Sequence, residues 1–221
     1  MLNWLQTFTR GGDGLREINK RFLEMLQDGR HIFDAAANSL LGGGDPEVIR
    51  EDLFRTDARI NLTEQEIRRG IVVHGTVHGA SAFPVLLTMM SLVKDAERVG
   101  DYAKNIFDLA ALRPDLDPDD VGELTVIKDQ VSTLLIRAHG IFKQQDVSTA
   151  QDFLKETDGL QNRCDARVEH CIKSSDRSRV TEVLAYRYFK RVASHVGNIV
   201  TSVVMPVDML DYFPGKPMSE Q

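Results

Sequence analysis

The sequence has only two cysteines, few aromatic residues and no long hydrophobic run. Cys164 and Cys171 are seven positions apart on one expected helix, roughly 10 Å along its axis. Because this spacing exceeds the reach of a disulfide and lacks the C-x-x-C pattern of a zinc site, we expect both thiols to be reduced and packed in the core. Aromatic residues make up 7% of the chain, and alternating β-branched segments are scarce, so strands are not expected.

An excess of positive charge is also missing, since the formal net charge is −6. A nucleic-acid-binding protein would carry a basic face, and electrostatic anchoring to a membrane would need a polybasic block. No apolar run is long enough to span a bilayer, and residues 1–8 are too short and polar for the core of a signal peptide. We therefore expect a cytoplasmic protein without a nucleic-acid partner.

The residues that are abundant favour an all-α fold. The chain of 221 residues is 42% hydrophobic and 27% charged, which is ordinary for a globular protein. Helix-forming stretches lie between proline, glycine and aspartate signals such as Asp117 and Asp146, which are expected to cap helices. The expected helices span about 15–41, 46–69, 84–112, 118–142, 147–173 and 176–205, with a glycine-containing joint over 70–80.

Two segments of the chain recur, which indicates a structural repeat. Residues 98–106 align with 191–199, sharing Arg, Val, Asn and Ile at the same relative positions, and residues 56–67 align with 157–168. The second alignment pairs Asp57 with Asp158, Asn61 with Asn162, and Glu64 with Asp165. The sequence thus predicts two tandem three-helix units, 13–113 and 115–207, and a loose tail over 208–221.

Helical spacing gathers oxygen-bearing side chains into stripes. In the first unit these are Asp57, Asn61 and Glu64 on one helix, and Glu97 and Asp101 on the next. The apolar residues of the second of these helices lie opposite, so we expect its stripe on an outer or groove side of the bundle. Oxygen ligands from two adjacent helices suit a divalent or iron cation. The alternative is a solvated face whose acids pair with Lys94 or Arg98.

The second unit offers a weaker set of candidate ligands, consisting of Asp158, Asn162, Asp165 and His195. Lys190 and Ser194 stand where the first unit has Glu97 and Asp101. A lysine at that position opposes cation binding, although the His195 imidazole could serve as a ligand.

Other motifs give little support to catalysis. His74 and His78 have the spacing of a helical metal-binding pair, but the neighbouring glycines favour a flexible joint. The run 42–44 of glycines is interpreted as a helix stop, since it lacks the Lys-Ser/Thr of a phosphate-binding loop. No nucleophile with an adjacent base is apparent, so we do not expect an enzyme.

The segment 95–106, with Glu97-x-x-x-Asp101 followed by Asn105 and Ile106, resembles the signature of the PhoU family. The resemblance covers about residues 13–205. It implies two three-helix bundles related by a pseudo-twofold axis, in a cytosolic regulator of phosphate uptake that often dimerises. It also implies a phosphate transporter at the inner membrane and a sensor histidine kinase as partners. Some members bind metal clusters through two such motifs.

The chain departs from the family pattern at Lys190 and Ser194, and in the joint before the signature helix. The leading hypothesis is a PhoU-like regulator that acts by protein–protein interaction. The alternative is a helical protein that senses or stores divalent or iron cations through the acidic stripes.

Overall fold

The structure, a computed structural model, describes residues 12–42, 45–112, 115–174 and 179–212. Its long helices are α2 (Asp13–Gly42), α3 (Glu47–His78), α4 (Phe83–Ala111), α5 (Pro118–Gln144), α6 (Val147–Lys173) and α7 (Val180–Val204). The described residues also form two short 3-10 helices, η1 (Gly79–Ala82) and η3 (Val207–Met209). No strand occurs in these ranges, so the predicted all-α class is confirmed.

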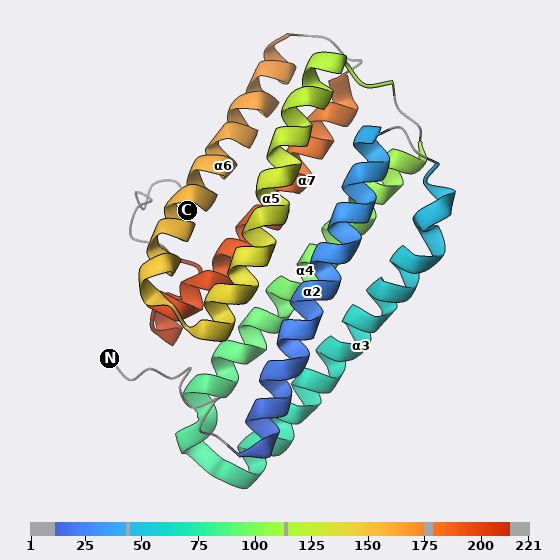
Figure 1. Cartoon of the computed structure of the whole chain (residues 1–221). Helices are drawn as coiled ribbons and strands as arrows, with labels where there is room; N and C mark the ends of the chain where they lie inside the picture. The colour runs from blue at the N-terminus through green and yellow to red at the C-terminus, as the bar shows by residue number, and fades with distance from the viewer. Residues whose placement is uncertain (1–11, 43–44, 113–114, 175–178, 213–221) are drawn as a thin grey trace.

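The long helices form an elongated bundle (Figure 1). Helix α2 packs on α3 and α4, while α7 packs on α5 and α6. The two groups meet where α4 contacts α7 and α2 contacts α5. Helices α3 and α6 therefore flank the bundle on opposite sides, and the inner helices share one core.

Contacts between α4 and α7 are reciprocal. Asp95 on α4 meets His195 on α7 at 2.7 Å, and Tyr102 on α4 lies near Tyr188 on α7 with ring centroids 6.0 Å apart. The sequence alignment of the two units pairs Asp95 with Tyr188 and Tyr102 with His195. A twofold axis generates this kind of exchange, because the counterparts of two contacting residues then also contact each other. The arrangement supports the predicted division into units 13–113 and 115–207, which stays a prediction.

The joint predicted over residues 70–80 is wrong, because α3 continues to His78. Its glycines serve close packing. A side chain at Gly70 would come within 3.2 Å of Ile18 on α2, and one at Gly75 would come within 3.2 Å of Leu86 on α4. The helix ends at Gly79, whose φ of 69° suits glycine best.

Two predicted caps are confirmed. The Asp117 side chain accepts a hydrogen bond from the Asp119 amide at 2.8 Å, and the Asp146 side chain accepts from the amides of Ser148 and Thr149, each at 3.1 Å. Hydrogen bonds from Thr149 and Ser148 lower the pKa of Asp146 to about 2. Both caps satisfy amides that a helix start leaves unpaired.

The structure describes only part of the remaining predicted helix ends. The cap expected at residues 175–176 and most of the glycine stop at 42–44 lie outside the described residues. The tail predicted from 208 begins with the last residues of η3, and the Asp211 amide donates to the Thr201 hydroxyl at 3.1 Å. Its residues 213–221 also lie outside the described part.

The core matches the sequence pattern of α4. The predicted inner face is buried and comprises Leu92, Ala96, Val99, Ala103, Ile106 and Ala110. Both cysteines are free and buried on α6, and burial raises the pKa of Cys164 to about 12. Such a thiol is a packing group rather than a nucleophile.

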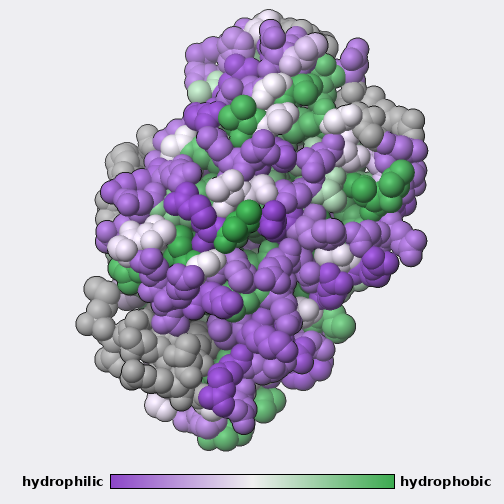
Figure 2. All heavy atoms as spheres, in the orientation of Figure 1, coloured by the Kyte–Doolittle hydropathy of each residue, from purple (hydrophilic) through white to green (hydrophobic). Residues whose placement is uncertain are grey.

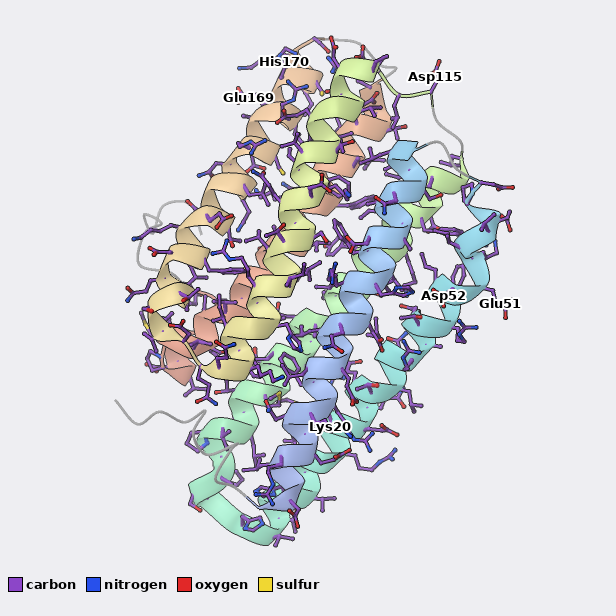
Figure 3. The ribbon with its side chains drawn as sticks, viewed as in Figure 1. Lys20, Glu51, Asp52, Asp115, Glu169 and His170 are labelled. Atoms are coloured by element: carbon purple, nitrogen blue, oxygen red, sulfur yellow. The ribbon has the colours of Figure 1, made fainter. Side chains whose placement is uncertain are left out.

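The face of the molecule shown in Figure 2 is largely hydrophilic. Lys20, Glu51 and Glu169 point away from α2, α3 and α6 in Figure 3. By length and composition alone, the helical stretch Glu47–Ala111 contains one window apolar enough to cross a membrane. That stretch reverses direction at η1, so α3 and α4 lie side by side in the bundle.

Candidate functional site

The acidic stripe of the first unit lies along the seam between α3 and α4. Asp57 and Glu64 of α3 and Glu97 of α4 are each only 8% exposed, whereas the Asp101 side chain is 28% exposed. The predicted placement on an outer or groove side is therefore wrong for most of the stripe. The reason is that α3 covers the face of α4 that the helical wheel of α4 alone leaves free.

Lys104 joins the two helices at one end of this seam. Its Nζ lies 3.1 Å from Asp57 Oδ1 and 3.1 Å from Asp101 Oδ1, and the Asn61 amide donates to Asp57 at 3.2 Å. Burial lowers the pKa of Lys104, but its hydrogen bonds to Asp57 and Asp101 outweigh that effect and raise the pKa overall. Gly100 allows this approach, since a Cβ there would lie 3.2 Å from Ile60.

Further along the seam, Glu97 and Glu64 approach each other as like charges. Burial raises the pKa of Glu97, and the negative charges of Asp101 and Glu64 raise it further. A hydrogen bond from Lys94 at 2.6 Å lowers the pKa, but the net shift is upward. Glu64 Oε1 lies 2.8 Å from Arg68. This oxygen nevertheless accepts no well-aligned hydrogen bond from any described residue. The seam thus holds an unsatisfied carboxylate oxygen.

The second unit carries opposite charges at the equivalent positions. Lys190 of α7, aligned with Glu97, forms an ion pair and hydrogen bond with Asp165 of α6, aligned with Glu64. Arg187 adds a second positive charge 3.6 Å from Asp165. The Asn162 amide donates to Asp158 at 3.3 Å, which repeats the bond seen in the first unit. The lysine therefore supplies internally the positive charge that a bound cation would bring.

His195 lies against the first unit. Its Nδ1 is 2.7 Å from Asp95 Oδ1, and the Asn198 amide donates to the same oxygen at 3.1 Å. The imidazole also stacks on Tyr102, with centroids 5.6 Å apart and ring planes at 26°. Sequence reasoning missed Asp95 as a partner, although it stands two positions before Glu97. This contact therefore competes with the predicted role of His195 as a metal ligand in the second unit.

These contacts decide how far each unit suits a metal ion. The second unit does not fit, because Lys190 occupies the charge position beside Asp165. The first unit has carboxylate donors on two helices and the unsatisfied Glu64 oxygen, and the side chains of Lys94 and Arg68 are both 43% exposed and able to move aside. Within the described ranges, no group of three or more His, Cys, Asp or Glu side chains is arranged to hold a metal ion.

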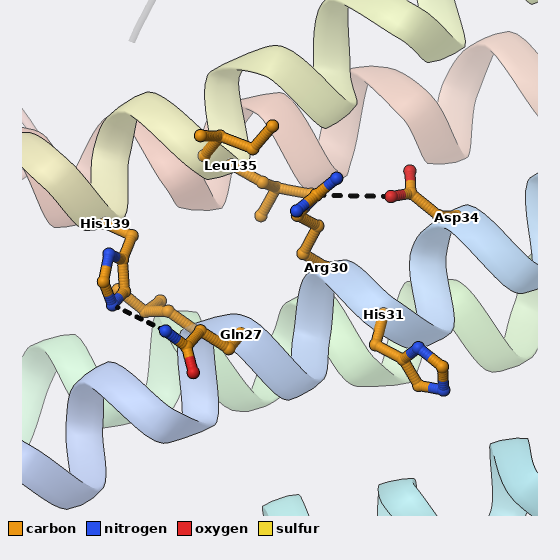
Figure 4. Close-up of a pocket in the computed structure, with 8 residues that line it drawn as sticks. Gln27, Arg30, His31, Asp34, Leu135 and His139 are labelled. Atoms are coloured by element: carbon orange, nitrogen blue, oxygen red, sulfur yellow. Dashed lines mark hydrogen bonds and ion pairs between the residues drawn. The ribbon is translucent and has the colours of Figure 1, made fainter.

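A groove of about 330 Å³ with both polar and apolar lining lies between α2 and α5, where the two units meet (Figure 4). Arg30 Nε lies 3.3 Å from Asp34 Oδ2, the Ser132 hydroxyl donates to the same oxygen at 3.1 Å, and Gln27 contacts His139 at 3.2 Å. Burial, followed by the charge of Lys143, lowers the pKa of His139. No sequence pattern gave a signal for this groove.

The described architecture is an all-α helical bundle, with Glu97 and Asp101 on α4. The PhoU domain profile matches residues 22–110. The match lies within the first unit. A search of curated proteins found no match.

Two solved structures share the fold over most of the chain. The crystal structure of PhoU from Pseudomonas aeruginosa has a TM-score of 0.74 at 20% identity, covering 86% of this chain and 95% of that one. The crystal structure of the phosphate transport system regulatory protein PhoU from Streptococcus pneumoniae has a TM-score of 0.68 at 17% identity, covering 86% and 92%. At these identities the likeness shows the fold alone.

Proposed function

We propose that this chain is a regulator of phosphate uptake and signalling that acts by binding other proteins. The observation that carries the proposal is the PhoU domain over residues 22–110, with the Glu97-x-x-x-Asp101 segment on α4. Its proposed partners are a phosphate transporter at the inner membrane and a sensor histidine kinase, and its proposed state is a cytoplasmic homodimer, peripheral to that membrane. We assign it no catalytic role.

The physical character of the molecule supports a binding role. Its helices are joined by buried polar contacts, and its outer surface is rich in exposed charge. Rigid helical faces with exposed charge can select partners through electrostatic complementarity. A catalytic role would need a nucleophile or base in a cleft, and the two buried thiols have raised pKa values.

Deleting the gene tests the regulatory role. We expect altered phosphate uptake and altered alkaline phosphatase expression in phosphate-rich cells, both restored by the wild-type gene. A matched control is complementation with Glu51→Ala, since the Glu51 side chain is 94% exposed and forms only a peripheral ion pair. Unchanged uptake and expression in both rich and phosphate-starved cells would contradict the proposal.

Cross-linking in cells followed by purification tests the partners. We expect phosphate transporter subunits or a sensor histidine kinase to copurify when phosphate is plentiful. Recovery of neither, from cells in which deletion does alter uptake, would reject these partners while leaving the regulatory role standing. Sedimentation of the purified protein tests the homodimer separately.

A second candidate function is binding of a divalent or iron cation in the first unit. The unsatisfied Glu64 oxygen beside Glu97 favours it, because a cation would relieve repulsion between these buried acids. Elemental analysis of protein purified without chelator, and thermal shifts with Mg²⁺, Mn²⁺, Fe²⁺ and Zn²⁺, are the tests. We expect Glu64→Gln to abolish any shift and Asp165→Asn, in the other unit, to leave it unchanged. Absence of bound metal and of any shift would exclude this function.

A further inference from the structure

An uncharged, apolar end of the bundle has no function in the regulatory proposal. From Gly70 to Val93 the sequence contains no Asp, Glu, Lys or Arg. This stretch forms the end of α3, η1 and the start of α4. Figure 2 shows hydrophobic atoms at the lower end of the molecule, where Figure 1 places this connection. Its exposed apolar side chains include Val72, Val73, Val77, Phe83 and Leu87.

Part of this surface is hollowed. A groove of about 560 Å³ lies between the first turns of α2 and the last turns of α3. Val73 and Val77, which are 58% and 72% exposed, line it together with the buried Ile18. An ion pair between Arg21 and Glu66 closes one side. The groove therefore presents apolar side chains that no described residue covers.

The ends of α2 and α3 approach closely beneath the groove. A Cβ at Gly14 would lie 3.1 Å from His74 Nδ1, and a Cβ at Gly70 would lie 3.2 Å from Ile18. His74 and His78 stack with centroids 4.0 Å apart. Burial, followed by the charge of His78, lowers the pKa of His74. Because these contacts fix the two helices, the groove is a shaped surface rather than a gap between loose ends.

We propose that this groove is the docking site for the chain's own amino-terminal segment, residues 1–11. That segment lies outside the described residues and joins α2 immediately before Gly14, which lines the groove. It carries the apolar side chains Met1, Leu2, Trp4, Leu5 and Phe8 and contains no Asp or Glu. These apolar side chains match the apolar lining of the groove, which includes Val73 and Val77.

Tethering favours this occupant over others. A segment attached at the rim of its site has an effective concentration in the millimolar range. A membrane surface is a poorer match, since the chain has a formal net charge of −6 and the groove carries no polybasic cluster.

Trp4 is the only tryptophan of the chain, so its fluorescence reports on the segment alone. We expect the wild-type protein to show a blue-shifted emission and weaker acrylamide quenching than a peptide of residues 1–12. Val77→Asp places a carboxylate against the docked apolar face and should shift the docking equilibrium on the order of tenfold toward release. The expected readout is a red shift and stronger quenching.

The matched control is Val48→Asp, at the far end of the same helix, where the side chain is 81% exposed. We expect it to leave the Trp4 emission unchanged, and circular dichroism should show both variants folded. Emission in the wild type equal to that of the peptide, or unaffected by Val77→Asp, would overturn the proposal. So would a blue shift that appears only with phosphatidylglycerol vesicles, or one that depends on protein concentration, since these indicate a membrane or a second copy. The outcome is independent of the proposed regulatory role.

Discussion

The buried charge of Asp120 should be the largest single electrostatic contribution to the stability of the second unit. Asp120 is fully buried near the start of α5. Its Oδ1 accepts hydrogen bonds from Arg167 of α6 at 2.5 Å and from the Tyr186 hydroxyl of α7 at 3.0 Å, and its Oδ2 pairs with Arg179. One carboxylate thus ties together three helices, and its place in the first turn of α5 also suits the helix dipole.

Asp120→Ala removes this acceptor and leaves its partners behind. The Arg179 side chain is only 17% exposed, and the buried Tyr186 hydroxyl loses its acceptor. Breaking a buried pair on one side costs about 3–5 kcal/mol. Because the Arg167 side chain is 31% exposed and can turn toward water, we expect about 3 kcal/mol. With a slope near 3 kcal/mol/M, the urea midpoint should fall by about 1 M.

Urea unfolding followed by circular dichroism measures this loss. Tyr186→Phe removes the hydroxyl that donates to Asp120 and accepts from Arg167, and it should cost about 1–2 kcal/mol. The matched control is Asp129→Ala on the same helix, whose carboxylate is 64% exposed and whose pair with Lys128 should contribute less than about 1 kcal/mol. A midpoint for Asp120→Ala within error of the control would refute the reasoning and show that the carboxylate is not the centre of this network.

Three further predictions concern the two seams and the groove between the units. Lys190→Glu places a second carboxylate beside Asp165 and should destabilise the fold by roughly 1 kcal/mol. Millimolar Mg²⁺ or Mn²⁺ should then restore part of the lost thermal midpoint. Lys190→Met, which only removes the ion pair, should show no such rescue. Burial raises the pKa of Glu97, so the charged form of Glu97 opposes folding. The stabilisation that protonated Glu97 contributes is fully present below the pKa of the unfolded state. It is lost as the pH rises through the pKa of the folded state. Glu97→Gln should therefore raise the urea midpoint at pH 7 but not at pH 4, and a lower midpoint at pH 7 would contradict this account. Burial lowers the pKa of His139. The stabilisation that neutral His139 contributes is therefore fully present above the pKa of the unfolded state, about 6.5. It is lost as the pH falls through the lower pKa of the folded state. His139→Asn should reduce the drop in midpoint between pH 7.5 and pH 5.5, and an unchanged drop would exclude His139 as a cause.

Sequence patterns predicted the helices well where local chemistry sets their limits. Asp117 and Asp146 accept hydrogen bonds from the amides that follow them, a local interaction that spacing alone reveals. The joint over residues 70–80 was predicted wrongly because Gly70 and Gly75 usually break helices. Their close contacts with Ile18 and Leu86 come from other helices, and tertiary packing outweighs the unfavourable propensity of glycine.

The candidate site was only partly accessible to sequence reasoning. Helical spacing placed Glu97 and Asp101 on one stripe, and the repeat paired Glu97 with Lys190. Neither pattern could show that Lys104 bridges Asp57 and Asp101, or that His195 contacts Asp95 across the two units. Such contacts depend on which helices become neighbours, and that information is spread over the whole chain.

By itself, the sequence determined that the protein is helical and that its second acidic motif is altered by Lys190, and it predicted two related units, because all three follow from local spacing and from comparing the chain with itself. Only the tertiary structure decided that α3 covers the acidic stripe of α4, which turned an expected surface into a mostly buried seam. It also decided that Lys190 pairs with Asp165. Burial and charge pairing result from the packing of whole helices, and a helical wheel describes each helix as though it stood alone.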